Sequence, residues 1–170
     1  MTAIVAPARS AGCATESDGN PAMKDTQTLD PWLDAERVAL RLREPGAELL
    51  VVLGAESWCG KCQRLKPAFD QLAMSMPKHV VPLWLDIEDH AEFLNGFVPP
   101  DLPLLLRWQA GNCVQAAVIQ DIDLKASPDE RVRLQILTLG AQSLLDPDEQ
   151  EPVQLPPLWA EFASEAWAGD

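Results

Sequence analysis

The chain has 170 residues, of which 47% are hydrophobic and 23% charged, as in ordinary globular proteins. Its net charge is -13, and residues 146–170 contain seven acids without a single Lys or Arg. This excess of negative charge argues against nucleic acid and anionic membrane as partners, because few cations are available to replace the counterions of phosphate groups.

The first 28 residues are predicted to form a flexible arm, since they are small, polar and rich in Pro, Gly and Ser. A signal peptide needs an apolar core of roughly 7–15 residues, whereas the apolar run from Ala3 to Ala8 is shorter and Arg9 follows it. No stretch approaches the roughly 20 apolar residues of a membrane span. We therefore expect a cytoplasmic protein, in which paired cysteines are more often redox-active or metal-binding than structural.

Helical spacing begins after Asp30-Pro31 and stops at Pro45-Gly46, which predicts a first helix over residues 32–44. The next segment, ELLVVLG, is a continuous apolar run of strand length and predicts a strand that is buried on both faces. A second helix is expected directly after it, because apolar residues recur at spacings of three and four from Cys59 to Met76.

The same patterns predict a buried strand, a short helix, an antiparallel hairpin and a last helix, at residues 79–89, 91–95, 102–119 and 127–145. The hairpin is expected to turn at Ala110-Gly111-Asn112. The last helix would open with a capping box, in which Ser127 is the cap and Glu130 stands three positions later. This order of elements predicts an α/β layered domain, parallel where helices cross over and antiparallel at one edge.

The segment 147–170 is predicted to be an acidic, Pro-containing tail that lies outside the domain. Its aromatic residues, Trp159, Phe162 and Trp167, leave two interpretations open. They either dock back on their own domain or form a hook that binds a partner.

The sequence Trp58-Cys59-Gly60-Lys61-Cys62 stands where the second helix is predicted to start. Cysteines three positions apart on a first helical turn share a face, with Cβ atoms roughly 5–6 Å apart. The unpaired N–H groups and the positive end of the helix dipole favour a thiolate on Cys59, and Lys61 adds a cation nearby. Cys62, one turn inside, is expected to stay protonated, while Gly60 admits a client backbone and Trp58 offers it an apolar surface.

At this point the chain resembles the thioredoxin family. Its WCGKC segment occupies the family's WCxxC position, after a buried strand and at a helix start, and Pro67 matches the proline that kinks this helix. The segment Asp101-Leu102-Pro103 resembles the one before the family's hairpin, in which the proline is cis and faces the dithiol. The resemblance covers roughly residues 29–146. It implies a thioredoxin-like three-layer fold, with a mixed four- to five-stranded sheet, a C-terminal antiparallel hairpin and helices on both faces.

The resemblance also implies a role for each residue of the site. Cys59 would be the attacking thiolate and Cys62 the resolving thiol of a thiol–disulfide oxidoreductase. Pro103 would be cis and shape the client groove, and Leu102 would offer backbone hydrogen bonds to an extended client strand. The implied partners are protein clients with disulfides or thiols, and a dithiol or flavoprotein reductase. No bound cofactor is expected, because the sulfurs carry the electrons.

The chain departs from typical thioredoxins at three positions. The buried acid six residues before the first cysteine is replaced by Leu53, and a lysine near that acid is replaced by Trp84. Lys61 stands where thioredoxins most often have a proline. We expect the resulting apolar floor to keep Cys62 protonated through desolvation. The dithiol should therefore be less reducing than that of a housekeeping thioredoxin and release mixed disulfides more slowly.

The cysteines admit four other interpretations. A structural zinc site usually needs four ligands, but Cys13 and Cys113 have no pairing motif and His79 and His90 show no ligand spacing, so no metal is expected. A Cys–His hydrolase would lack an orienting third residue. A purely structural dithiol stays possible, as does a weakly or non-redox adaptor that binds one partner through its tail and groove.

Overall fold

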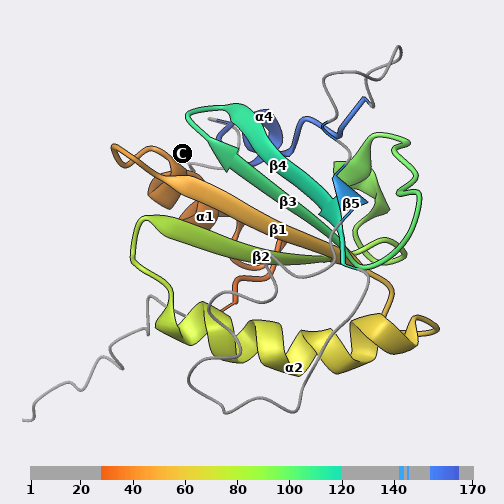
Figure 1. Ribbon diagram of the computed structural model, residues 1–170. Helices are drawn as coiled ribbons and strands as arrows, with labels where there is room; N and C mark the ends of the chain where they lie inside the picture. The colour runs from red at the N-terminus through yellow and green to blue at the C-terminus, as the bar shows by residue number, and fades with distance from the viewer. Residues whose placement is uncertain (1–27, 120–141, 144, 146–153, 165–170) are drawn as a thin grey trace, which may run out of the picture.

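The computed structural model describes residues 28–119, 142–143, 145 and 154–164, and these residues build one sheet with helices on both faces. The sheet has five strands in the order β2-β1-β3-β4-β5 (Figure 1). The strands are β1 (Glu48–Gly54), β2 (Val80–Asp86), β3 (Leu104–Gln109), β4 (Asn112–Val118) and β5 (Gln142–Ser143). The helices among the described residues are α1 (Ala35–Leu42), α2 (Gly60–Ser75), α4 (Leu158–Phe162) and the 3-10 helix η1 (Ala91–Leu94).

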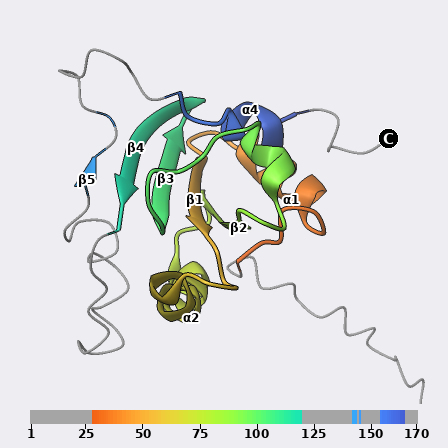
Figure 2. The ribbon, with the colours of Figure 1, turned by 90° about the vertical axis from the view of Figure 1, so that its right-hand side faces the viewer.

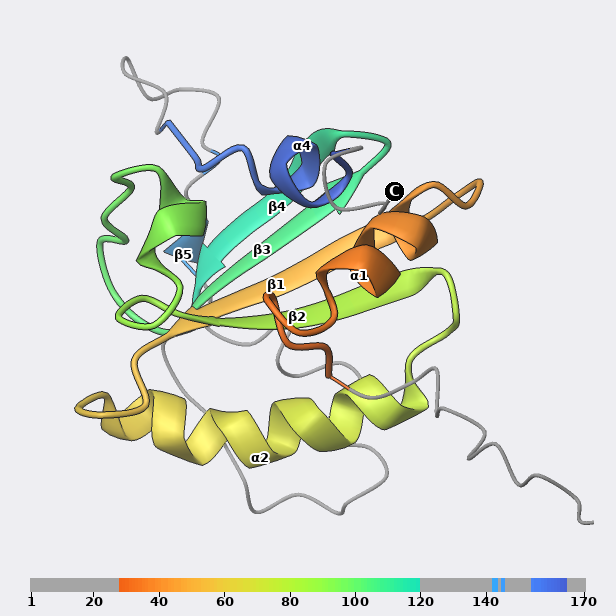
Figure 3. The same ribbon diagram turned by 180° about the vertical axis from the view of Figure 1, so that it is seen from behind.

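The described helices form a layer on each side of the sheet. Helix α2 covers one face, while α1, η1 and α4 cover the other (Figures 2 and 3). Strand β1 lies inside the sheet, parallel to β2 and antiparallel to β3. The predicted three-layer α/β fold with a mixed sheet is thus confirmed.

The apolar sequence of strand β1 explains its buried position in the middle of the sheet. Every side chain from Leu49 to Leu53 is at most 3% exposed, because helices cover the strand on both faces. Burial of each such side chain stabilises the fold by about 1.5–3 kcal/mol. No polar side chain would be tolerated at these positions without a hydrogen-bond partner, which explains the unbroken apolar run.

The hairpin β3–β4 follows the prediction in its turn as well as in its strands. Ala110 and Gly111 have φ angles of 49° and 82°, the left-handed region that glycine adopts without strain. The ladder contains an irregularity between Arg107 and Trp108. Cys113, on the second strand, is half-buried and free, and its partial burial raises the pKa of its thiol.

The end of the last predicted helix is wrong. Gln142 and Ser143, which fall inside the predicted helix 127–145, instead pair antiparallel with Val118 and Ala117 as strand β5. A sheet edge presents unpaired N–H and C=O groups that a neighbouring segment satisfies, whatever that segment's own helical pattern. The capping box at Ser127 lies outside the described residues.

Part of the predicted tail belongs to the hydrophobic core. In α4, Leu158 and Phe162 are fully buried, and the Phe162 ring stacks on Phe93 of η1 at 4.8 Å between centroids. Trp159 packs partly buried against the core, near the turn at Gly111. The docking interpretation is therefore confirmed for Trp159 and Phe162, whereas Trp167 lies outside the described residues.

The described chain enters the fold beside β2. Leu29 forms a parallel bridge with Leu83, and its N–H donates to the Pro82 carbonyl at 3.3 Å. The Asp30 carboxylate then accepts hydrogen bonds from the N–H groups of Trp32 and Leu33, and this capped turn leads into α1. None of the helices in the described residues is long and apolar enough to cross a membrane.

Candidate functional site

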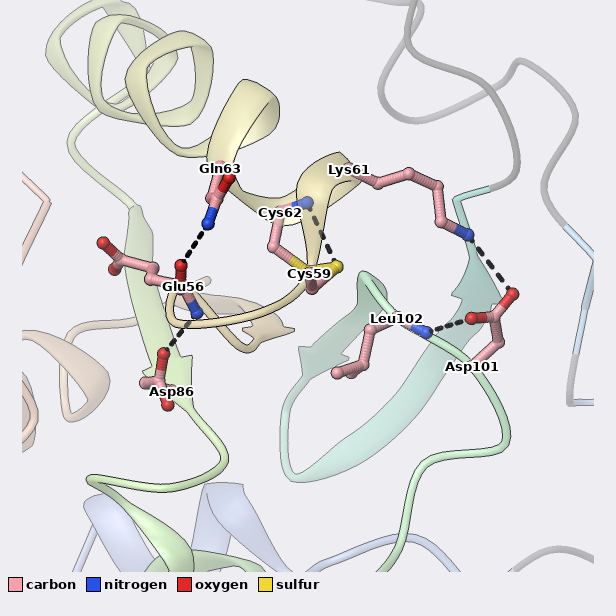
Figure 4. Close-up of a disulfide and its surroundings, with 8 residues drawn as sticks. All are labelled: Glu56, Cys59, Lys61, Cys62, Gln63, Asp86, Asp101 and Leu102. Carbon is pink, nitrogen blue, oxygen red and sulfur yellow. Dashed lines mark hydrogen bonds and ion pairs between the residues drawn. A yellow bond between two sulfur atoms is a disulfide. The ribbon is translucent and has the colours of Figure 1, made fainter.

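The dithiol sits on the turn that joins the central strand to α2. Strand β1 ends at Gly54, and Cys59 is the N-cap of the helix that begins at Gly60. Cys59 and Cys62 form a disulfide, with their Cα atoms 5.2 Å apart. The Cys59 sulfur also accepts a hydrogen bond from the Cys62 N–H at 3.2 Å (Figure 4). The predicted position of the pair at the helix start is confirmed.

The two sulfurs have different surroundings. Cys59 is 7% exposed to solvent and lines a groove, whereas Cys62 is 0% exposed and packs in the core. Trp58, next to them, is 62% exposed. A partner in solution can therefore reach only the small exposed edge of Cys59 at the groove and no part of Cys62.

The groove beside Cys59 is largely apolar and has a volume of about 510 Å³. The residues around it come from the dithiol turn, the end of β2 and the segment before β3: Trp58, Cys59, Gly60, Lys61, Ile87, Val98, Pro99, Pro100, Asp101 and Leu102. Four other predicted site residues thus line one groove with Cys59, namely Trp58, Gly60, Lys61 and Leu102, whereas Pro103 does not line it. The exposed Val98, which the sequence analysis did not single out, contributes to its rim.

The peptide bond between Leu102 and Pro103 is cis, as the resemblance implied. The Pro103 carbonyl accepts the Ile119 N–H at 2.9 Å, which ties this turn to the end of β4. Leu102 is buried, and its N–H donates to Oδ1 of Asp101 at 2.8 Å. The backbone group that was expected to meet a client is therefore held by a side chain of the same chain.

Asp101 also reaches across the groove to the dithiol helix. Its Oδ2 lies 3.2 Å from Nζ of Lys61, and both contacts are visible in Figure 4. The hydrogen bond from the Leu102 N–H, followed by the Lys61 ammonium, holds the pKa of the Asp101 carboxyl below its ordinary value of 3.8. Lys61 therefore faces a carboxylate as well as the helix start.

Asp86, at the end of β2, fixes the turn that carries the cysteines. This buried carboxylate accepts the N–H of Glu56 at 2.8 Å and that of Glu88 at 2.9 Å. Gln63, on the first turns of α2, donates to the Glu56 carbonyl at 2.7 Å. Asp86 lies inside the predicted strand 79–89, and its role at the site was not predicted. The signal that could have revealed this role is an acidic residue at the end of a buried strand, next to the turn that follows the neighbouring strand.

A sequence model described as thioredoxin matches residues 40–126, about half of the chain. The chain belongs to the thioredoxin family. The family in general acts on protein thiols and disulfides, and this chain carries a close cysteine pair.

Two thioredoxins of known structure are similar to the chain. A mutant thioredoxin from Halobacterium salinarum NRC-1 is 25% identical, with a TM-score of 0.38, over 45% of this chain and 66% of its own. Trichomonas vaginalis thioredoxin is 25% identical, with a TM-score of 0.39, over 49% of this chain and 78% of its own. The chain thus spans just under two thirds of the first thioredoxin. No curated protein matches the sequence.

This thioredoxin-family chain has no charged pair at its two altered core positions. Leu53 and Trp84 are both buried, as expected. The register pairs Trp84 with Val52 and Leu53 with Leu85, so the two side chains project to opposite faces of the sheet. The expectation that they form one apolar floor together is wrong. Leu53 is paired with Leu85, and Leu85 and its neighbour Trp84 point to opposite faces of the sheet.

Trp84 lies under α2. Its ring is 5.9 Å from that of Phe69, and the Lys66 ammonium lies 5.6 Å from the indole centroid. A Cβ at Gly54 would overlap the same indole, so any other residue at the strand end would require the Trp84 ring to move. The buried Nε1 of Trp84 makes no hydrogen bond with any described residue.

The remaining candidates for metal or nucleophile chemistry are not assembled in the described part of the chain. His90 accepts the Asp86 N–H through Nδ1 at 2.9 Å, which gives it a structural partner. Across the described ranges, no cluster of three or more His, Cys, Asp or Glu could hold a metal ion. Cys13 lies outside those ranges.

Proposed function

We propose that this chain exchanges disulfides with protein clients, with Cys59 as the nucleophile and Cys62 as the resolving thiol. The observation that carries the proposal is the position of Cys59. Its sulfur sits at the N-cap of α2, accepts the Cys62 N–H and borders an open apolar groove, while Cys62 is buried behind it.

The helix start supports the nucleophile in the reduced protein. An N–H that points at the sulfur, together with the positive end of the α2 dipole, favours the thiolate over the thiol. Lys61 stabilises the Cys59 thiolate less than an unpaired lysine would, because the Asp101 carboxylate, 3.2 Å away, offsets much of its positive charge. The backbone of α2 therefore supplies the principal stabilisation of the Cys59 anion.

In the reducing direction, the Cys59 thiolate attacks one sulfur of a client disulfide in line with the S–S bond. A Cys59–client bond forms, and the second client sulfur leaves as a thiolate and takes a proton. Cys62 then loses its proton and attacks the Cys59 sulfur, so the Cys59–Cys62 disulfide forms and the first client sulfur leaves. Two electrons have moved to the client, and a dithiol or flavoprotein reductase must return them.

The groove would hold the client during these steps. Trp58 and Leu102 would offer apolar contact to either side of the client's sulfur, and Gly60 leaves room for its backbone. An extended client segment would pair with the backbone of Leu102 as an added strand. Such contacts supply affinity with little demand on the client's side chains, which suits an enzyme with several clients.

We further propose that the working unit is the domain from residue 29 to about 146, completed by α4, in a cytoplasmic setting where glutathione keeps thiols reduced. The docking of Leu158 and Phe162 supports the inclusion of α4.

A trapping experiment tests the proposed function. Cys62→Ser keeps the nucleophile and removes the resolving thiol, so it should accumulate disulfide-linked clients that reductant releases. Cys59→Ser/Cys62→Ser is the control and should capture none. The wild-type chain, reduced beforehand, should also reduce the disulfides of insulin. If the double-serine variant captures the same proteins, or the wild type leaves insulin oxidised, the proposal is wrong.

A further inference from the structure

We propose that Asp101 gates the client groove, because its carboxylate occupies the Leu102 N–H that an incoming client backbone must take over. We call the two contacts of this carboxylate, to the Leu102 N–H and to the Lys61 ammonium, the Asp101 gate. The inference rests on the proposed function and names a specificity-determining residue for it.

Each oxygen of the Asp101 carboxylate contacts one partner. Oδ1 accepts from Leu102 N–H at 2.8 Å, and Oδ2 lies 3.2 Å from Lys61 Nζ. These partners come from opposite sides of the groove, since Leu102 precedes β3 and Lys61 is on the first turn of α2 (Figure 4). The gate therefore bridges the groove next to Cys59.

A backbone N–H is a single donor, so the client's carbonyl and the Asp101 carboxylate compete for it. A hydrogen bond to an ionised acceptor is roughly twice as strong as one to a neutral carbonyl. The closed gate consequently weakens the docking of any client that uses backbone pairing at Leu102. A client too small to reach Leu102 is unaffected by this competition.

The gate can open toward solvent. The Asp101 side chain is 55% exposed, whereas Leu102 is buried. When a client carbonyl takes the Leu102 N–H, the carboxylate can rotate into water and keep its ion pair with Lys61, whose side chain is 30% exposed. Opening thus exchanges one hydrogen bond and leaves the fold in place.

Two variants separate the hydrogen bond from the charge. Asp101→Ala removes both contacts of the gate. Asp101→Asn removes the charge while its amide oxygen still accepts from the Leu102 N–H. Asp70→Ala is the matched control, because it deletes a carboxylate that pairs with Lys66 on the same helix and does not line the groove.

The assay compares two uncharged disulfides against the reduced, full-length chain. One is a blocked, uncharged cysteine peptide dimerised through its disulfide, and the other is 2-hydroxyethyl disulfide. Asp101→Ala should raise the second-order rate constant for the peptide about three- to tenfold, the range expected for one released hydrogen bond. The rate with 2-hydroxyethyl disulfide should change less than twofold. Asp101→Asn should fall between wild type and Asp101→Ala, and Asp70→Ala should match wild type.

A second measurement does not depend on activity. Exchange of the Leu102 amide hydrogen, followed by NMR in the full-length protein, should be faster in Asp101→Ala than in wild type and unchanged in Asp70→Ala.

The outcomes distinguish a failure of the Asp101 gate from a failure of the proposed disulfide exchange. An equal acceleration with both disulfides would mean that Asp101 acts only on the charge around Cys59, and the gate would be refuted. A peptide rate that stays constant or falls in Asp101→Ala would refute it as well. Should the wild type react with neither disulfide, the proposed function itself fails, and the gate fails with it.

Discussion

The carboxylate of Asp86 accepts the N–H of Glu56 at 2.8 Å, although 30 positions of sequence separate the two residues. This contact joins the end of β2 to the turn that carries the cysteines. The same carboxylate accepts the Glu88 N–H, so one buried side chain satisfies two backbone donors.

Replacement of Asp86 should therefore weaken the fold at the site. Asp86→Ala leaves the Glu56 and Glu88 N–H groups without their acceptor, and we expect the free energy of unfolding to fall by about 2–4 kcal/mol. Asp86→Asn retains one acceptor oxygen and should lose less. Urea unfolding of the oxidised protein measures both values. Asp89→Ala, an exposed acid of the same turn, is the control, and an equal loss in this variant would show that Asp86 has no special role.

The docking of α4 leads to a second expectation. Phe162 is fully buried and stacks on Phe93, so Phe162→Ala should lower the free energy of unfolding by about 3–5 kcal/mol. The exposed Ala160→Ser on the same helix should change it little. Thermal or urea unfolding gives both numbers. A Phe162→Ala variant as stable as wild type would mean that this aromatic ring is free, as a partner-binding hook would require.

The redox potential depends on the core near the dithiol. Trp84, which lies under α2, and Leu53, on the opposite face of the sheet, are apolar where the resemblance to thioredoxins implies a buried charged pair, so no such pair helps Cys62 to lose its proton. We expect a midpoint potential above the value of about -270 mV that holds for thioredoxin. Equilibration in glutathione buffers measures it, and single-turnover kinetics should show slow resolution of the mixed disulfide. A potential at or below that value, with fast resolution, would contradict this prediction.

The Asp101 carboxyl should titrate at a lower pH than a free aspartate. Its pKa lies below 3.8 in the folded protein, first because of the Leu102 N–H and then because of Lys61. A carboxyl whose pKa is lower in the folded state adds stability above the unfolded pKa, and this stability disappears as the pH falls through the folded pKa. The loss therefore belongs to pH values below about 4. NMR titration of the carboxyl carbon should show the low pKa, and Lys61→Gln should move it only part of the way back, since the larger contribution comes from Leu102.

The sequence predicted those parts of the site that neighbouring residues determine. Cys59 and Cys62 share one helical turn, so their position at the helix start followed from the apolar run before them. The cis bond at Pro103 required the family resemblance, because no local pattern dictates it. The contacts of Asp86 and Asp101 escaped prediction, since each joins segments that only the folded chain brings together.

The misplaced end of the last predicted helix has a physical origin. Gln142 and Ser143 belong to a segment with a helical pattern, yet they pair with the free edge of β4 as a strand. A tertiary surface here outweighs the local preference. The sequence of residues 147–170 left two interpretations open, and the contacts of α4 with α1 and η1 favour docking, which only the folded chain could decide.

Because Cys62 is completely buried, the number of cysteines in this motif that react with an alkylating reagent, once the disulfide is reduced, should report whether the chain is folded. A bulky alkylating reagent such as N-ethylmaleimide would label Cys59 and halt, because the second sulfur is sealed inside packed side chains. Once the chain loses its tertiary structure, both sulfurs accept the label. The stoichiometry of modification at this motif therefore counts unfolded molecules in a mixture, without any spectroscopic probe.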